Sequence, residues 1–532
     1  MSTLSELLPS GGNQNEVEFV ASGTLPSGQA VVLKTNGQVE AVAESSSVGA
    51  VIPVGSGVIF NDGNTGADFG SVEFDPSTTG KFVVVYNNNG APAYGAYGTA
   101  IVGTLSGNSI TFGTAVVFNS ASTEKCTIAF DPNIAGKFVA SYHDNGNSSR
   151  GTAIVGTVSG TSISFGTAVV YESGVTIRPR IAFFESPANK VVIAYRDQSD
   201  GAYGKAIVGT VSGTSISFGS EATFNAFTLE CDVAVDPNTA GKCIIVYSDG
   251  SNGAKGTAIV GTVSGTSISY GSEYIYNSSG ESEFSSIAFD PNTSGKFVVV
   301  YKDQPNSSYG TSIVGTISGT SLSFGSEIIF NATQSAKPSI SFDPNTAGKF
   351  VVAYINVEAT DNKGKAIIGT VSGNSISYSS DYIFNASSSN TSTSISFDPN
   401  TSGKFVIAQQ DSSNGTKGTI FLGDLAGTVV TTNVADFVGI TSAAITSGAS
   451  GDIVLKGGIA ASVANTPLLQ VYGSEAVFNS GTSNYVSLSF DPNTTNKFVV
   501  VYRDNQNLNY GTACVGTISG NSISFGSEVV FN

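Results

Sequence analysis

The sequence predicts an all-β protein whose main part is a β-propeller. A segment of the type FDPNTAGKFVVVY occurs eight times, and we number the copies one to eight by the position of its aspartate: 75, 131, 184 (where Phe184 replaces the aspartate), 236, 290, 343, 398 and 491. The first seven positions are 52 to 56 residues apart, and the eighth follows after 93. Glycine is frequent, at 63 of 532 residues, and charged residues make up only 12%, which is typical of a turn-rich β protein. Repeats of this length without helical periodicity favour four-stranded propeller blades.

Each copy divides into four strands. The first is of the SIAFD type, which alternates apolar and small residues, and the DPNTAGK loop leads from it to the second strand, KFVVVY. A continuous apolar run of this kind suits burial on both faces. A variable polar loop leads to the third strand, GTAIVGTVSG, and an SGTS turn leads to the fourth, SISFGSEVVFN. In DPNT the Asp and Asn side chains can satisfy the turn backbone, and the following glycine provides a position with positive φ.

The ends of the repeat region indicate how the propeller closes. The segment GSGVIFN at 55–61 matches the second half of a fourth strand, and copy seven lacks its own fourth strand after GTIFLGDLAG at 418–427. We therefore expect Gly55–Asn61 to lie antiparallel to Gly418–Gly427, which would remove the exposed edges of a seven-bladed ring over about 54–427. The alternative is an eight-bladed ring with an excursion after blade seven.

The flanking sequence predicts a second, smaller β module. Residues 1–16 form an N-terminal arm, 17–53 the first part of the module, with a hairpin at Asn36-Gly37, and 428–472 its second part. If both parts form one domain, the propeller at 54–427 is an insertion within it. Residues 473–532 are an additional blade-like repeat, and the strand at 497–502 cannot be covered by its own blade. We expect Phe498, Val500 and Tyr502 to be covered by a neighbouring chain, a continuation of the protein or the ring.

Composition disfavours several classes of function. The chain has 23 basic and 40 acidic residues, a net charge of −17, and no run of Lys or Arg, which argues against a nucleic-acid partner. No apolar run approaches the length of a membrane span, so we expect no membrane insertion. The N-terminus lacks the basic and apolar regions of a signal peptide, so we expect a soluble protein made in a cytoplasm. The four cysteines occupy strand positions suited to small apolar residues and predict no disulfide framework.

Catalytic residue types are scarce, and we predict neither an enzyme nor a cofactor or metal site. His143 is the single histidine, and we expect it to be solvated at a strand end. The Asp of each FDP motif, and the Asp that follows most second strands, are expected to form turns. Arg178, Arg180 and Arg196 invite comparison with sialidase propellers, whose arginine triad grips a carboxylate. Sialidases draw these arginines from different blades, whereas here all three lie in copy three, so we do not predict sialidase chemistry.

The loops after the second strands carry the functional signal. The DPNTAGK and SGTS loops are nearly identical between copies and are expected on one face, whereas the loops after the second strands differ in every copy and are expected on the opposite face. These variable loops are rich in Tyr, Asn, Asp and Ser, a mixture that suits glycans and protein surfaces. The alternative is that the loops are simply variable and polar. The candidate ligand-binding residues are Tyr94, Tyr97, Asp197, Tyr203, Asp303 and Tyr309.

Two flanking segments, TLPSGQAVVLKTNGQVEAVA and DFVGITSAAITSGASGDIVLKGGIA, surround the repeats. Together with the repeats, this arrangement resembles virion structural proteins of tailed phages, particularly marine ones. The resemblance implies a tail-fibre-like appendage protein, found in the virion and assembled in the host cytoplasm. Its partners would be other virion proteins, copies of itself in a homo-oligomer, and a glycan or protein of the host surface. Two alternatives remain: a purely structural component, such as a nozzle or capsid decoration, and a cell-surface lectin or adhesin.

Overall fold

The computed structural model describes residues 16–20, 30–33, 39–41, 50–64, 70–89, 96–358, 361–386, 390–411, 415–425, 437–441, 450–454, 483–490, 497–504, 507, 510–519 and 522–531. The chain forms two compact units, which are described separately. The large unit is Gly49–Gly427, and the small unit combines Met1–Val48 with Thr428–Asn532. Within the described ranges, no helix is long and apolar enough to cross a membrane.

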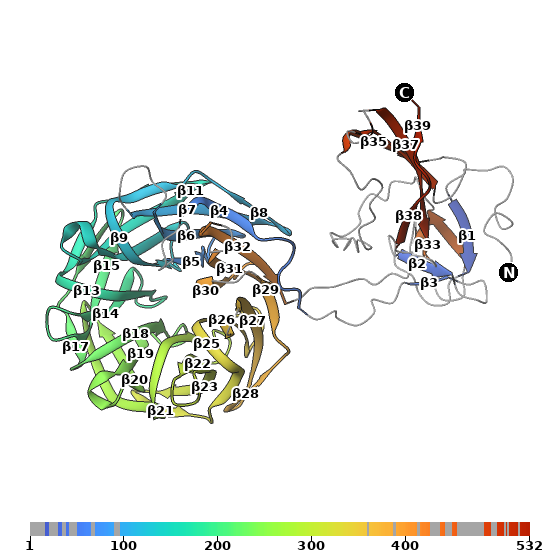
Figure 1. Cartoon of the computed structure of the whole chain (residues 1–532). Coiled ribbons are helices and arrows are strands. Elements are labelled where there is room, and N and C mark those ends of the chain that lie inside the picture. Colours follow the sequence, from blue (N-terminus) through green and yellow to red (C-terminus); the bar gives the residue numbers. More distant parts are fainter. Residues whose placement is uncertain are drawn as a thin grey trace. The chain divides into compact units, whose positions relative to one another are not determined.

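The large unit is all-β and propeller-like, with its strands arranged in a ring (Figure 1). The first strands of the copies are β5 (Ser71–Phe74), β18 (Thr228–Val235), β30 (Asn390–Phe397) and the second halves of β9 (Val116–Phe130), β13 (Val169–Phe183), β21 (Ser267–Phe289) and β25 (Ile328–Phe342). The second strands are β6 (Lys81–Asn88), β10 (Lys137–Asp144), β14 (Lys190–Asp197), β19 (Lys242–Asp249), β22 (Lys296–Asp303), β26 (Lys349–Glu358) and β31 (Lys404–Asp411).

The third strands are β7 (Tyr97–Ser106), β11 (Arg150–Ser159), β15 (Tyr203–Ser212), β20 (Lys255–Ser264), β23 (Tyr309–Ser318), β27 (Asp361–Ser372) and β32 (Lys417–Asp424). The fourth strands are formed by β8 (Ser109–Phe112), β12 (Ser162–Phe165), β16 (Ser215–Phe218), β17 (Ala222–Asn225), β24 (Ser321–Phe324), β28 (Ser375–Tyr378), β29 (Tyr382–Asn385), β4 (Val58–Asn64) and the first halves of β9, β13, β21 and β25. Short 3-10 turns, η2 (Asn145–Asn147) and η3 (Gly250–Asn252), follow two second strands.

The core lies between neighbouring sheets. On one face of the sheet of copy one, Val83, Val85 and Val102 pack against Phe138 and Tyr142 of copy two. Equivalent clusters join the following sheets. Because each second strand is sandwiched between two sheets, its central residues are buried on both faces, as predicted from the KFVVVY run.

The DPNTAGK loop also joins neighbouring sheets. The N–H of Asn133 donates to Oδ1 of Asp131 at 2.9 Å, which confirms the predicted turn role of the aspartate. In addition, the N–H of Gly136 donates to Oδ2 of Asp75 in the preceding copy at 2.9 Å. The same loop is tied to the SGTS end of its own sheet, because the N–H of Val158 donates to the carbonyl of Gly136 at 2.8 Å. These two loops therefore lie on one face, as predicted, and we call it the constant face.

Strand β4 pairs antiparallel with β32, with Asn61 opposite Gly418 and Ile59 opposite Thr419, which confirms the predicted pairing. Phe60 lies over Gly418, where a Cβ atom would stand 2.3 Å from the ring. Its ring centroid is 5.1 Å from that of Tyr86 in copy one. Residues from the two ends of the large unit therefore share one core.

The small unit contains a sheet of the order β1-β34-β33-β2-β3. Its strands are β1 (Glu16–Val20), β2 (Ala30–Leu33), β3 (Val39–Ala41), β33 (Phe437–Thr441) and β34 (Ser450–Val454). The register places Glu18 opposite Asp452 and Val31 opposite Gly439, so segments from both flanks of the large unit form one sheet. Asn36-Gly37 and the predicted N-terminal arm up to residue 15 lie outside the described residues.

Copy eight belongs to the small unit and forms β35 (Ser483–Phe490), β36 (Lys497–Asp504), β37 (Tyr510–Ser519), β38 (Ser522–Phe525) and β39 (Val529–Val530). Phe498, Val500 and Tyr502 are each 3% exposed and cluster with Cys514 and Phe525 of the same copy. They are therefore buried as expected, whereas the expected cover by a neighbouring chain, a continuation of the protein or the ring stays a prediction. On the other face, Val499 is 39% exposed and Val515 is 46% exposed.

Candidate functional site

The variable loops lie at the ends of the second strands, on the face opposite the constant face, and we call this the loop face. In copies one to five, the end of this loop accepts a backbone hydrogen bond from the base of the next first strand. The N–H of Thr176 donates to the carbonyl of Ser149 at 3.0 Å, that of Thr228 to Ala202 at 2.9 Å, and that of Ser335 to Ser308 at 2.9 Å. The loops therefore vary at their tips and share a fixed base.

Residues at the bases of these loops have a left-handed backbone conformation. Ser149, Ala202 and Ser308 have φ values of 62°, 65° and 61°. For residues with a Cβ atom this conformation is sparsely populated and persists where the surrounding structure enforces it. The buried hydrogen bonds at the loop bases supply that constraint.

The predicted carboxylates lie under this face. Asp197 and Asp303 are each 3% exposed. Asp197 Oδ1 accepts the N–H of Ser199 at 3.0 Å and its Oδ2 accepts Lys205 Nζ at 2.8 Å, while Asp303 Oδ1 accepts Asn277 Nδ2 at 3.1 Å. This burial disfavours the predicted ligand contact for both aspartates, because their oxygens already hold the loop and the neighbouring strands.

Tyr97, Tyr203 and Tyr309 begin the third strands of copies one, three and five. All three side chains are at least partly accessible, and Tyr203 is 37% exposed. The intervening copies carry Arg150 and Lys255 at the same position. The structure thus spreads the three tyrosines around the loop face and does not bring them into one pocket. Tyr94 lies outside the described residues.

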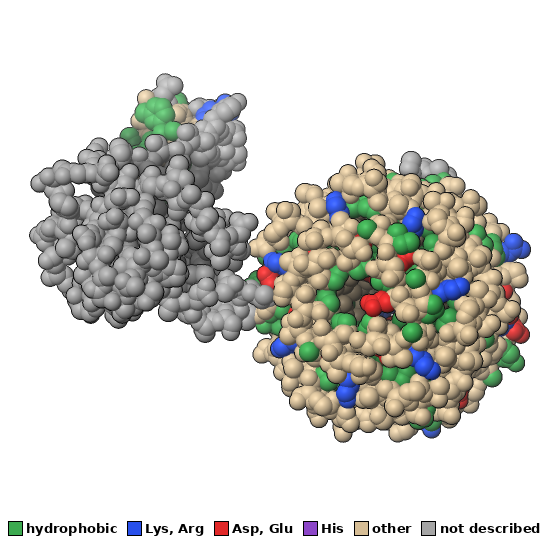
Figure 2. Space-filling model, turned by 180° about the vertical axis from the view of Figure 1, so that it is seen from behind, with side chains coloured by type: hydrophobic (Ala, Val, Ile, Leu, Met, Phe, Trp, Pro, Cys, Tyr) green, Lys and Arg blue, Asp and Glu red, His purple; other side chains and the backbone are tan. Residues whose placement is uncertain are grey.

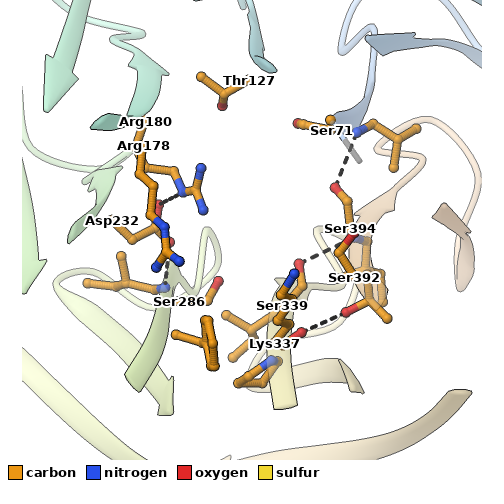
Figure 3. Close-up of a pocket in the computed structure, with 18 of the residues that line it drawn as sticks. Ser71, Thr127, Arg178, Arg180, Asp232, Ser286, Lys337, Ser339, Ser392 and Ser394 are labelled. Atoms are coloured by element: carbon orange, nitrogen blue, oxygen red, sulfur yellow. Dashed lines mark hydrogen bonds and ion pairs between the residues drawn. The ribbon is translucent and has the colours of Figure 1, made fainter. Parts of the chain in front are cut away.

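The first strands line a central channel with a cavity of about 380 Å³ (Figure 3). Because these strands run from the loop face to the constant face, their inward-facing residues form layers. The mouth layer, on the loop face, contains Lys125, Arg178, Glu230, Phe284, Lys337 and Ser392. The middle layer contains Ser71, Thr127, Arg180, Asp232, Ser286, Ser339 and Ser394, and the lower layer includes Glu73, Ser341 and Ser396. Figure 2 shows one face of the large unit, with Lys and Arg side chains spread singly around a central hollow.

Strained backbone recurs at the mouth. Lys125, Arg178, Phe284 and Lys337 occupy the same position in four copies, and their φ values are 52°, 49°, 53° and 46°. At each of them the register of the first strand shifts against the second strand. Bulges of this kind redirect a side chain, and here they line the rim of the channel.

Ion pairs connect the channel walls of copies three and four. Arg178 forms an ion pair with Glu230 and lies over the ring of Phe284, 5.6 Å from its centroid. Arg180 Nε lies 3.6 Å from Oδ1 of Asp232, whose Oδ2 accepts the N–H of Ile287 at 3.1 Å. Arginine from copy three and backbone from copy five are thus held by the carboxylates of copy four.

Burial raises the pKa of three carboxyl groups that line the channel. Burial raises the pKa of Glu73 to about 8, although the N–H of Phe130 lowers it in part. Burial also raises the pKa of Glu230, against the lowering effect of Arg178, and that of Asp232, against the lowering effect of Arg180.

A second cavity of about 270 Å³ adjoins the mouth and shares Arg178, Glu230 and Phe284 with it. Arg196 lines this cavity and donates from Nη1 to the carbonyl of Leu229 at 3.4 Å. Burial and the charge of Arg178 lower the pKa of Arg196. Of the three arginines of copy three, Arg178 thus lies at the mouth, Arg180 lies in the middle layer, and Arg196 lines the adjoining cavity. They come from one sheet, as the sequence indicates, but sequence reasoning set them aside as a site.

Two further expectations have clear outcomes. His143 is 6% exposed and neither ring nitrogen has a hydrogen-bond partner in the part of the chain that is described, so the prediction of a solvated histidine is wrong. The reason is that β10 is packed between neighbouring sheets, so all its residues, Lys137–Asp144, are buried, including the last ones. Burial lowers its pKa. The four cysteines are unpaired and buried, which confirms their role as apolar residues of the core.

Comparisons with known proteins give weak similarities. No family model and no curated protein matches the chain. Among solved structures, Saccharomyces cerevisiae Sqt1 is 9% identical, with a TM-score of 0.41, 89% of this chain and 100% of that chain being covered. Chaetomium thermophilum Sqt1 bound to the N-terminus of the ribosomal protein L10 is 12% identical over 75% of this chain and 86% of that chain, with a TM-score of 0.36. An ulvan lyase of a new family of polysaccharide lyase, bound to -[GlcA(1-4)Rha3S]-, is 10% identical over 70% of this chain and 95% of that chain, with a TM-score of 0.44. At these scores the similarities carry no argument about function.

Proposed function

We propose that this protein is a non-enzymatic, tail-fibre-like appendage protein of a phage virion, and that its large unit is a recognition module. The observation that carries the recognition role is the division of the large unit into a constant face and a loop face, whose loops share fixed bases and differ at their tips. The virion assignment rests on the resemblance of the repeats and flanking segments. A purely structural virion component is the alternative.

The large unit in this proposal is a closed ring of seven blades. Support comes from contacts between copies seven and one. Asp398 Oδ2 accepts the N–H of Gly80 at 3.2 Å, just as Asp290 Oδ2 accepts that of Gly348 at 2.9 Å between copies five and six. Asn400 Nδ2 donates to the carbonyl of Pro76 at 3.2 Å. Since the same bonds recur at an internal junction and at the junction of the two ends, the seventh sheet neighbours the first.

A fixed base under variable tips suits binding. Ordering a loop on association costs conformational entropy, and loops already held by buried hydrogen bonds have less of this entropy to lose. Tyrosine adds a large contact area with few rotatable bonds. Tyr203 and Tyr309 are placed to make such contacts at the rim of the loop face.

A non-enzymatic role is proposed because the groups best suited to acid–base catalysis are buried or already paired. The single histidine is buried within a sheet, and the channel carboxylates Glu230 and Asp232 hold arginines and backbone N–H groups. In this proposal the small unit attaches the ring to other virion proteins, and copies of the chain associate with one another.

The test is binding of the labelled full-length protein to host cells and to a glycan array. We expect the double variant Tyr203→Ala/Tyr309→Ala to bind at least about tenfold more weakly, because the few residues that dominate an interface are enriched in tyrosine and each contribute about 2 kcal/mol or more. Ile134→Ala is the matched control, since Ile134 is 42% exposed on the constant face, and it should bind normally. Unchanged binding by the tyrosine variant would mean that this face is the wrong one. No binding to any host cell or glycan would favour the structural alternative.

A further inference from the structure

The central channel has the size of a small-ligand pocket. Its cavity of about 380 Å³ lies in the range of pockets that hold small molecules. Its upper layer, which includes Lys125 and Arg178, lies at the loop-face ends of the first strands.

The mouth and middle layers of the channel also carry several cationic side chains, although the protein as a whole is acidic. The chain carries a net charge of −17, yet Lys125, Arg178 and Arg180, from the first strands of copies two and three, line the same cavity. The carboxylates of Glu230 and Asp232 already pair with the two arginines, and burial keeps the pKa of Glu73 near 8. A cleft with low-dielectric walls focuses such a field and attracts anions.

Arg180 retains the capacity to bind an anion. Its side chain is 40% exposed, its Nη1 donates to the carbonyl of Pro179 at 3.3 Å, and its Nε lies 3.6 Å from Asp232. A guanidinium has five N–H donors in a planar fork that matches a carboxylate. Figure 3 shows Arg180 beside Asp232 on the channel wall, where its remaining donors face the cavity.

Hydroxyl groups surround the same layer. Ser394 Oγ accepts the N–H of Val72 at 3.2 Å, and Ser339 Oγ accepts that of Ile395 at 3.4 Å. A serine hydroxyl that accepts one bond still has an O–H to donate. The serines therefore join neighbouring first strands and also present donors to the cavity, which suits a ligand rich in oxygen.

We propose that the central channel binds an acidic monosaccharide of the uronic-acid class, with its carboxylate between Lys125 of the mouth layer and Arg180 of the middle layer and its hydroxyls toward the serines of the middle layer. The strained backbone at Lys125 and Arg178 supports this site, because such conformations are retained where they position functional groups. The inference rests on the proposed function, since the saccharide would be an end group of a receptor glycan.

The experiment is isothermal titration calorimetry of the full-length protein with sodium glucuronate. We expect a dissociation constant of about 1 mM, typical of a small polar ligand, and a loss of affinity as salt is raised. Glucose tests the need for the carboxylate and sodium acetate tests the need for the sugar, and both should bind at least about tenfold more weakly.

Arg180→Gln should weaken glucuronate binding at least about tenfold, the effect of losing one charge-assisted contact. The control is Arg503→Gln, which makes the same substitution at a position outside the channel, in the second strand of copy eight, and it should leave binding unchanged. If circular dichroism shows that Arg180→Gln does not fold, Lys125→Gln decides in its place. The proposal is overturned if glucuronate does not bind, if glucose or acetate binds equally well, or if the folded channel variants bind like the unsubstituted protein.

This outcome is separable from that of the proposed function. Glucuronate binding without recognition of any host cell would retain the channel site and reject the recognition role. Host-cell binding that depends on Tyr203 and Tyr309, without any binding of glucuronate, would retain the recognition role and reject the channel site.

Discussion

Truncation of Phe60 tests whether the large unit closes through its N-terminal strand. Phe60 is 7% exposed, lies over Gly418 and contacts Tyr86 and Phe112, with ring centroids 5.1 and 6.1 Å away. Phe330 occupies the same repeat position within the unit: it is also 7% exposed, lies over Gly310, and its centroid is 5.2 Å from that of Tyr354. Removing a buried phenylalanine side chain costs about 3–5 kcal/mol. We therefore expect Phe60→Ala and Phe330→Ala to destabilise the protein by similar amounts in this range.

The assay is urea unfolding of the full-length protein, followed by circular dichroism and tyrosine fluorescence, with hydrogen exchange of residues 58–64 as a local readout. Both variants should shift the midpoint to lower urea. If Phe60→Ala costs less than about 1 kcal/mol while Phe330→Ala costs about 3–5 kcal/mol, strand β4 is not packed against β32 in solution and the ring is not closed in this way. Rapid exchange at residues 58–64 in the unsubstituted protein would lead to the same conclusion.

Three further changes follow from the contacts described above. Asp398→Ala removes the acceptor for two N–H groups, that of Asn400 at 3.0 Å and that of Gly80 at 3.2 Å. It should therefore lower the free energy of unfolding, measured in urea, by about 2–3 kcal/mol, as should Asp290→Ala at the internal junction. A much smaller cost for Asp398→Ala would contradict a closed ring. Lys205 Nζ donates to Asp197 at 2.8 Å and to Glu221 at 2.9 Å. Lys205→Met should lower the free energy of unfolding by about 3 kcal/mol, because it leaves the buried carboxylate of Asp197 unpaired. The control Lys255→Met should change this free energy by less than about 1 kcal/mol. Burial raises the pKa of Glu73 from its ordinary 4.5 to about 8, so folding takes up a proton when the pH lies between these values. The free energy of unfolding should therefore fall by about 1.4 kcal/mol for each unit by which the pH rises across that interval. Glu73→Gln should flatten this dependence in thermal melts from pH 5 to 9, and an unaltered slope would assign it to other groups.

The strands and their connections were predictable because repetition amplifies the sequence signal. Eight similar copies reveal the positions of strands and turns more clearly than any single copy, and the unmatched segment at 55–61 points to its partner. The bonds from Asp75 to Gly136 and from Asp398 to Gly80 were not predicted, because a turn-forming role already accounts for an aspartate at that position. The burial of His143 was missed because a residue at the end of a strand is usually exposed, whereas here the packed sheets bury the whole of β10.

The channel could have been found by comparing the same position in consecutive copies. Arg178 and Glu230 occupy one repeat position in copies three and four, and Arg180 and Asp232 occupy another. In a propeller, such positions are neighbours on adjacent first strands, so opposite charges there predict ion pairs between adjacent walls of the channel. What the sequence alone does not supply is the distance between the walls, which depends on how the sheets pack.

Copy eight shows what each sheet gains from its neighbours. Val499 and Val515 are 39% and 46% exposed, whereas Val83 and Val102, at the same positions in copy one, are fully buried. The sequences of these strands are nearly the same, so the difference arises from the presence of a following sheet and not from the strands themselves. Phe531 makes the same point: it is 64% exposed, whereas its counterpart Phe60 is 7% exposed under Tyr86 of the next copy. The apolar face of copy eight therefore has the chemistry of a sheet-to-sheet interface, and the stability of the other copies depends on filling that interface on both sides.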